Sequence, residues 1–311
     1  MKKKNKIIIG SRGSELALWQ AGYIKKELKR IHKTLFVEIK IIKTKGDKIL
    51  NKALSKIGDK SLFTKELEEE LLNNKIDIAV HSLKDLETSL PKGLKLAVVT
   101  KRHPVEDVLI AKKKRLTIAS LPENAIVATG SLRRKSQLLH LKPDLKIVGL
   151  RGNVPTRIDK FLKSNWDAII LARAGVERLN LKKHISSYIK TYEIVPAVGQ
   201  GALGIEINEQ NKRAAGLIKP LHDEKTFTEI TAERSFLKAL GGGCQVPIGA
   251  YAIIKSNGLY LSGIVASPDG KTTYSKTVRG RKNDAVKMGR LLAKDILKAG
   301  AKQILNEVYK S

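Results

Sequence analysis

"IDIAVHSLKDL", residues 76–86, joins a short apolar run to a cluster of polar side chains. The run has the length of a buried strand, and it is followed at once by His81, Ser82, Lys84 and Asp85. Four other segments repeat this arrangement of an apolar run followed by Ser, Thr or Arg. They are "IIIG" before Ser11, Arg12 and Ser14; "AIVAT" before Gly130, Ser131, Arg133 and Arg134; "LKIVGL" before Arg151, Asn153 and Arg157; and "AIILA" before Arg173 and Arg178.

These strands alternate with helix-like segments through the first two hundred residues. The segment after the first strand has apolar side chains at helical spacing, at Leu16, Trp19, Tyr23 and Leu28. Residues 61–74 predict a second helix, which Thr64 could cap. The alternation starts again near residue 105, so we expect an α/β protein with two doubly wound units.

The pattern changes from about residue 220. A helix over 226–240 is ended by Gly241, and three strands follow, joined by turns at residues 256–258 and 268–270. A last long helix is predicted over 284–309. This part of the chain predicts a small α+β domain with an antiparallel sheet.

The polar strand ends predict a binding site. In open α/β sheets, ligands bind outside the carboxyl ends of the strands, where helix N-termini also favour anions. One polar loop would mean little, because loops are usually solvated, but five loops of this kind indicate a shared function. Arg recurs in them although Lys is common elsewhere, and Arg suits bidentate binding of carboxylate or phosphate. We therefore expect a polyanionic ligand larger than one small ion.

The composition limits the class of protein. The net charge of +30 invites a nucleic-acid role, but the lysines are spread along the chain and aromatic residues are 5% of it, so we expect no nucleic-acid partner. No run approaches the length of a membrane span, and we expect no membrane association. The six His residues show no metal-ligand spacing, which predicts no metal site. A single Cys and the lack of an apolar signal core predict a cytoplasmic protein.

Two residues stand out chemically. Asp85 is an acid among cations, which is most simply a salt-bridge partner but could also face a developing positive charge. Cys244, the single cysteine, lies in "LGGGCQVPIGA", residues 240–250. A lone thiol is usually a buried, inert side chain. Here the glycines remove bulk in front of the sulfur, which favours an attachment point.

The chain resembles the porphobilinogen deaminase (hydroxymethylbilane synthase) family over nearly its whole length. The segments that carry the resemblance, in family order, are "GSRGSELALWQA", "SKIGDKSLFTKELEEELL", "IDIAVHSLKDL", "GSLRRKSQL", "LRGNVPTRIDK", "DAIILARAGVERL", "PAVGQGALGIE" and "AERSFLKALGGGCQVPIGAY". The resemblance implies two domains similar to the lobes of type II periplasmic binding proteins, and a third domain carrying the cysteine. It implies domain 1 at 1–100 and 201–219, domain 2 at 101–200 and domain 3 at 220–311. A monomer is also implied.

The implied reaction condenses four molecules of porphobilinogen head to tail, with loss of ammonia, to give hydroxymethylbilane for haem biosynthesis. Cys244 matches the residue that holds a dipyrromethane cofactor through a thioether, one per chain, and Asp85 matches the catalytic acid. Further matches to cofactor-binding positions are Ser82, Lys84, Thr129, Ser131, Arg133, Arg134, Arg157 and Gly201. Matches to substrate-binding positions are Arg12, Ser14, Lys56, Lys60, Arg151, Arg178 and Gln200.

Three residues depart from the family pattern. Glu87 stands where Pro is usual, Lys45 where Arg is common, and Arg173 where a small residue is usual; for Arg173 we favour a surface charge over a ligand contact. Two other functions fit part of the pattern: an anion-binding module without catalysis, and a polyanion binder driven by net charge. Asp85 and Cys244 argue against the first, because a passive receptor requires neither residue. A steep salt dependence with no preference for porphobilinogen would support the second.

Overall fold

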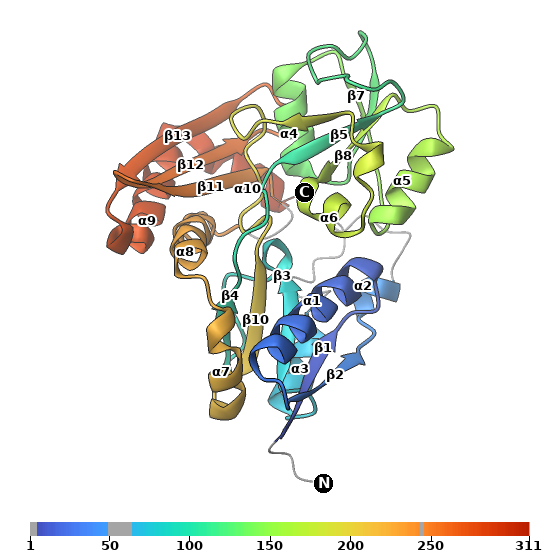
Figure 1. Ribbon diagram of the computed structural model, residues 1–311. Coiled ribbons are helices and arrows are strands. Elements are labelled where there is room, and N and C mark those ends of the chain that lie inside the picture. The colour runs from blue at the N-terminus through green and yellow to red at the C-terminus, as the bar shows by residue number, and fades with distance from the viewer. Residues whose placement is uncertain (1–4, 49–63, 243–245, 311) are drawn as a thin grey trace. The chain divides into compact units, whose positions relative to one another are not determined.

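A computed structural model describes residues 5–48, 64–242 and 246–310 (Figure 1). The chain divides into two compact units. The first unit is Met1–His103 with Ala202–Phe227, and the second is Pro104–Gly201 with Thr228–Ser311. Each unit is described by itself below.

The first unit contains a five-stranded sheet in the order β2-β1-β3-β10-β4. The strands are β1 (Lys6–Ser11), β2 (Phe36–Ile41), β3 (Ile78–Ser82), β4 (Leu94–Val99) and β10 (Leu203–Asn208). β1 runs parallel to β2 and β3, whereas β10 is antiparallel to β3 and β4. The chain therefore returns to the first sheet after building the second.

Helices cover both faces of this sheet. Helix α1 (Glu15–Ile31) packs Ile24 and Leu28 on one face, and α3 (Lys65–Leu72) packs Leu67 and Leu71 on the other. The remaining helices of the unit are α2 (Lys45–Lys48), η3 (Leu83–Asp85), α7 (Lys212–Ile218) and η5 (Lys219–Leu221). Thr64 lies at the start of α3 as predicted, but its side chain makes no capping hydrogen bond there.

The predicted helix is present as α1, but not all of its apolar side chains are buried. Trp19 and Tyr23 are each 37% exposed and stack on one another with ring centroids 5.7 Å apart. The helix buries Gln20, Ala21, Ile24 and Leu28 instead. Ala21, Ile24 and Leu28 join the hydrophobic cluster on this face of the sheet, whereas the two large rings are partly exposed.

The second unit contains a five-stranded sheet in the order β7-β6-β8-β5-β9. The strands are β5 (Asp107–Ala111), β6 (Ile126–Ala128), β7 (Lys146–Val148), β8 (Ala168–Ala172) and β9 (Ser187–Ile189). β6 is parallel to β7 and β8, but β5 is antiparallel to β8. The helices are α4 (Leu132–Leu141), α5 (Val154–Leu162), α6 (Arg173–Arg178) and η4 (Lys182–His184), and hydrophobic clusters line both faces of the sheet.

The second unit also holds a three-stranded antiparallel sheet, β11 (Ile248–Lys255), β12 (Gly258–Ala266) and β13 (Thr273–Gly280). Its core is closed by α8 (Glu224–Ala239) and by α9 (Ala285–Ile296). The short helix η6 (Lys282–Asp284) precedes α9, and a π-helical turn η7 (Leu297–Ala301) leads to α10 (Lys302–Lys310). The predicted single long helix is therefore wrong, because Gly300 breaks it at φ 124°. The predicted fold class, two doubly wound α/β parts and a small antiparallel sheet, is confirmed.

Candidate active site

In the first unit, the carboxyl ends of β1 and β3 bring two predicted groups to one sheet edge. The strands are parallel neighbours, so Ser11 and Ser82 end at the same edge. Arg12 and Ser14 follow β1, and Ser14 caps α1 by accepting a hydrogen bond from the Ala17 backbone N–H at 3.4 Å. Lys84 and Asp85 follow β3 in the short helix η3.

Asp85 is exposed at the tip of a turn that is anchored on both sides. Leu83 and Leu86 are buried, and the Leu83 backbone N–H donates to the Ala202 carbonyl oxygen at 3.1 Å. The buried Gln20 donates its side-chain N–H to Ser82 Oγ at 2.7 Å. Because its neighbours are fixed in the interior, the Asp85 carboxylate is presented to solvent from a defined position.

A buried group of titratable side chains lies below this turn. His81 Nε2 is 3.0 Å from Glu206 Oε2, and both side chains are buried. Glu68 of α3 is also buried, and burial raises its pKa, as do the nearby charges of Glu206 and Glu87. His81 is therefore a packed residue that supports the Asp85 turn.

In the second unit, three parallel strands end at another sheet edge. β6 leads through Thr129 to Ser131, which caps α4 by accepting from the Arg134 backbone N–H at 3.4 Å. β7 leads to Arg151 and, through the Asn153 cap, to α5. Arg157, in α5, donates from Nε to the Gly152 carbonyl oxygen at 2.7 Å. Burial lowers the pKa of the Arg151 guanidinium.

Arg133 and Arg134 lie in the first turn of α4 and are buried. Both guanidinium groups bind the carboxylate of Asp107, with the Nη2 atom of each 2.8 Å from an Asp107 oxygen. Burial opposes ionisation of Asp107, but the two guanidinium groups hold its pKa far below its usual range. The arginines that the sequence suggested as ligand-binding cations thus already share one acid.

The chain segment before β10 joins this edge. Gln200 donates from Nε2 to Asp107 Oδ1 at 2.8 Å and to the Val105 carbonyl oxygen at 2.6 Å. Arg178 is buried and donates from Nη2 to the Gly201 carbonyl oxygen at 2.9 Å. The structure therefore brings together the candidates of the second unit: Thr129, Ser131, Arg133, Arg134, Arg151, Arg157, Arg178, Gln200 and Gly201.

The predictions on Cys244, Lys56 and Lys60 lie outside the described residues. Of the departures from the family pattern, Arg173 is not a free surface charge. Its guanidinium lies 4.5 Å from the Tyr188 ring centroid and pairs with Glu177 at 3.0 Å and Glu106 at 3.5 Å. Arg173 is thus a partly exposed charge paired with two acids, and the preference for a surface charge over a ligand contact stays a prediction.

Asp107 was missed by the sequence analysis, which searched the carboxyl ends of strands. Asp107 begins β5, and its amino end reaches this edge because β5 runs antiparallel to β8, pairing Asp107 with Ala172. The available signal was an acid directly before the apolar run "VLIA", together with two adjacent arginines that would need a partner if buried.

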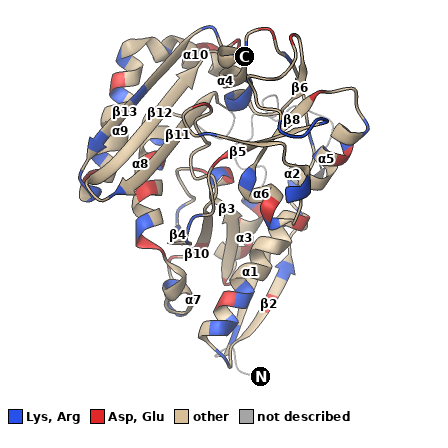
Figure 2. Cartoon of the chain, turned by 45° about the horizontal axis from the view of Figure 1, so that its top comes forward, with Lys and Arg blue, Asp and Glu red and all other residues tan. Residues whose placement is uncertain are grey.

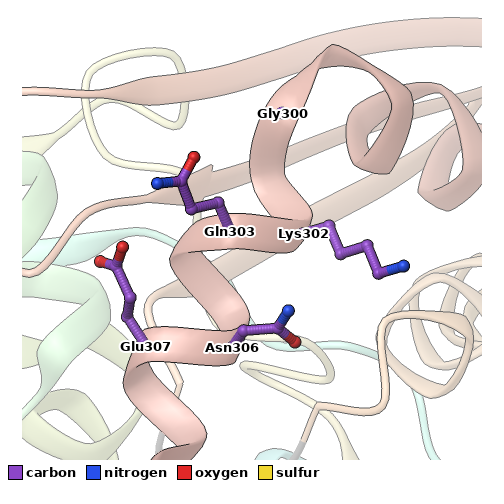
Figure 3. A pocket seen from close by; sticks show the side chains of 5 residues that line it. All are labelled: Gly300, Lys302, Gln303, Asn306 and Glu307. Atoms are coloured by element: carbon purple, nitrogen blue, oxygen red, sulfur yellow. The ribbon is translucent and has the colours of Figure 1, made fainter.

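Lys and Arg positions are distributed over helices and strands of both units in the described part of the chain (Figure 2). A hollow of about 480 Å³ in the C-terminal region is lined by Gly300, Lys302, Gln303, Asn306 and Glu307. Gln303 and Glu307 point to one side of α10, and Lys302 and Asn306 to the other (Figure 3). These side chains do not converge on one point, so the hollow does not resemble a ligand site.

Each of the two edges, taken by itself, carries donors suited to anions, and the edge in the first unit also carries one exposed acid. Arginine and hydroxyl donors follow the strands in both units, and Asp85 is the exposed carboxylate on its turn. Such donors bind carboxylates, and a carboxylate beside them can stabilise a positive charge on a reacting group.

Comparison with known proteins agrees with this chemistry. Residues 7–216 match the family described as porphobilinogen deaminase, dipyromethane cofactor binding domain, and residues 227–298 match the C-terminal domain of the same family. The chain belongs to the porphobilinogen deaminase family. Family members are hydroxymethylbilane synthases, enzymes of porphyrin and haem biosynthesis with a dipyrromethane cofactor.

Individual relatives match over almost the entire chain. The porphobilinogen deaminases of Carboxydothermus hydrogenoformans and Chloroherpeton thalassium are each 47% identical, over 305 and 310 residues, with 98% of this chain and 98% of the relative covered. Among solved structures, the methionine binding protein MetQ is 15% identical with a TM-score of 0.46, covering 73% of this chain and 91% of that chain. In the described part of the chain, no helix is long and apolar enough to cross a membrane.

The donor set fits the family's cofactor. A dipyrromethane carries acetate and propionate groups, which are carboxylates at neutral pH. The strand ends supply guanidinium, hydroxyl and amide donors for such groups, including Arg151, Arg157 and Ser131.

Proposed function

We propose that Asp85 is the catalytic acid of hydroxymethylbilane synthesis in this chain. The observation that carries the proposal is the Asp85 turn: an exposed carboxylate between buried Leu83 and Leu86, at the same sheet edge as Arg12 and Ser14. This places one fixed negative charge among donors suited to the substrate's carboxylates. The reaction condenses four porphobilinogen molecules head to tail.

Each condensation breaks a C–N bond and a C–H bond and forms a C–C bond and an N–H bond. The C–N bond of the aminomethyl group breaks, and its nitrogen leaves as ammonia with a proton. A C–C bond then joins that carbon to the α-carbon of the neighbouring pyrrole, whose displaced proton must be accepted. The Asp85 carboxylate accepts hydrogen bonds from pyrrole N–H groups, stabilises the positive charge as ammonia leaves, and carries the proton between steps.

The other residues bind and orient. When bound, the dipyrromethane supplies the pyrrole carbon to which the first substrate is joined. Cys244 holds it as a thioether, and the cofactor-binding residues are Ser82, Lys84, Thr129, Ser131, Arg133, Arg134, Arg157 and Gly201. Substrate carboxylates are bound by Arg12, Ser14, Arg151, Arg178 and Gln200, with Lys56 and Lys60.

The chain organisation and setting are part of the proposal. We infer three domains, at 1–100 with 201–219, at 101–200, and at 220–311. The return of β10 to the first sheet and the separate hydrophobic cluster of the C-terminal sheet support this division. We also infer a cytoplasmic monomer; the single cysteine suits a reducing compartment.

The test is the Asp85→Asn variant, which keeps the size of the side chain and removes its charge. We expect kcat for porphobilinogen consumption to fall by about 10²–10⁴-fold, since the charge and the proton acceptor are both lost. The circular dichroism spectrum and Tm should not change, because Asp85 is exposed. Glu27→Gln on the surface of α1 is the matched control and should keep full activity. Full activity in Asp85→Asn would refute the role of this residue.

A further inference from the structure

The carboxylate of Asp107 accepts hydrogen bonds from three side chains. Oδ1 accepts from Arg134 Nη2 and Gln200 Nε2, each at 2.8 Å. Oδ2 accepts from Arg133 Nη2 at 2.8 Å and Arg134 Nε at 3.1 Å. An ionised carboxylate offers about four acceptor sites. Asp107 is therefore saturated by protein donors and acts on a ligand only through these three side chains.

The sheet topology places this carboxylate beneath the strand ends. Asp107 is the first residue of β5 and pairs with Ala172, the last residue of β8. The adjacent Arg133 and Arg134 occupy the first turn of α4, whose start is fixed by the Ser131 cap. One buried acid thus connects the antiparallel strand β5 to the helix that follows β6.

Gln200 reaches Asp107 from a chain segment that is itself held in place. The backbone of Val195 accepts from Arg133 Nη1 at 2.8 Å and donates to Gln137 Oε1 at 2.7 Å. Further along, the Gly199 backbone N–H donates to the buried Glu233 at 2.8 Å. The segment 195–201 is therefore bound to α4, to α8 and, through Gln200, to Asp107.

The charges of this cluster do not cancel. Two guanidinium groups and one carboxylate leave a net charge of +1 on three buried side chains. Burial lowers the pKa of Arg133, and Asp107 opposes that effect. Asp107 thus lowers the cost of burying two cations in adjacent positions while one positive charge remains for an anionic ligand.

We propose that Asp107 is a positioning residue for the cofactor site: it sets the orientation of Arg133 and Arg134 toward the carboxylates of the dipyrromethane, and it holds Gln200 beside them. The proposal rests on the proposed function, which places Arg133 and Arg134 among the cofactor-binding residues and Gln200 among the substrate-binding residues. It differs from a role in folding alone, because it requires that cofactor attachment depend on the direction of the carboxylate as well as on its presence.

The test compares Asp107→Asn and Asp107→Glu with the unaltered full-length chain. Each protein is purified, incubated with porphobilinogen, and followed by intact mass for the appearance of the covalent cofactor. Asp107→Asn increases the local positive charge but replaces one acceptor oxygen by an N–H donor facing guanidinium groups. We expect cofactor attachment at least tenfold slower in this variant, whereas an effect of charge alone would leave it unchanged or faster.

Asp107→Glu keeps the negative charge but moves the carboxylate by the length of one methylene group. Its attachment rate should fall between those of Asp107→Asn and the unaltered chain, with a circular dichroism spectrum close to the latter. If Asp107→Asn does not fold, Asp107→Glu decides alone. Attachment at the unaltered rate in a folded variant of either kind would overturn the proposal.

The exposed Asp159 provides the matched control, because it pairs only across one helical turn with Lys163 among the described residues. Asp159→Asn should acquire the cofactor at the unaltered rate. Absence of the cofactor from the unaltered chain and from Asp159→Asn, both as purified and after incubation, would instead contradict the proposed function. Failure of the Asp107 proposal and failure of the proposed function are thus distinguished by which proteins remain without cofactor.

Discussion

Glu68, His81 and Glu206 place titratable side chains inside the first unit, on the side of the sheet covered by α3. Glu206 Oε2 lies 3.0 Å from His81, while Glu206 Oε1 is buried without a hydrogen-bond partner among the described residues. Burial, with Glu206 and Glu87, raises the pKa of Glu68 above its ordinary value of 4.5. A carboxyl group of this kind binds its proton more tightly in the folded chain than in the unfolded one.

This pKa shift predicts a pH-dependent effect of Glu68→Gln. Between the ordinary pKa and the raised one, the folded state binds more protons, so the free energy of unfolding falls as pH rises. The amide of the variant cannot ionise, so the introduced side chain causes no such decrease in the free energy of unfolding as pH rises. We expect the unfolding free energy of the variant, minus that of the unaltered chain, to increase from pH 4 to pH 7 in urea titrations. A difference in unfolding free energy that stays constant or decreases would contradict the raised pKa of Glu68. Glu69→Gln, exposed on the same helix, is the control.

At the scale of elements, two helical glycines have opposite surroundings. A Cβ at Gly289 in α9 would lie 2.5 Å from the Ala232 carbonyl oxygen of α8 and 2.6 Å from Ser235 Cβ. A Cβ at Gly22 in α1 would meet nothing within 4 Å.

Gly289→Ala should therefore destabilise the chain by about 1–3 kcal/mol through overpacking. Gly22→Ala should stabilise it by up to about 1 kcal/mol. Urea midpoints of both variants, at equal m-value, measure the difference, and equal midpoints would contradict the close packing of α8 on α9.

The elements that sequence predicted well are those whose pattern is local. β3 and β8 follow their apolar runs, and Gly241 ends α8 at a φ of 67°. The predictions were wrong where tertiary packing, and not the local pattern, determines where an element ends. The last helix breaks at Gly300, whose φ of 124° is not helical. A Cβ there would lie 2.3 Å from the Tyr274 hydroxyl, so the site requires glycine, and helical periodicity does not reveal this neighbour.

For the whole molecule, the two sheet edges could be predicted because polar residues follow parallel strands. Asp107 could not, because whether β5 runs parallel or antiparallel is fixed by long-range pairing with β8. Gln200 was among the predicted binding residues, but its contact with Asp107 spans 93 residues of sequence and could not be predicted for the same reason. Residue types thus indicated a carboxylate-binding site, but only the topology showed which acid organises its arginines.

The proposed function requires that Cys244 carry a cofactor on which this chain builds its product. Intact mass tests this on the purified chain beside a Cys244→Ser variant, before and after incubation with porphobilinogen. We expect a mass increase of one dipyrromethane on the unaltered chain and none on the variant under either condition. An unaltered chain that remains unmodified after incubation, or a variant that carries the same increase, would contradict it.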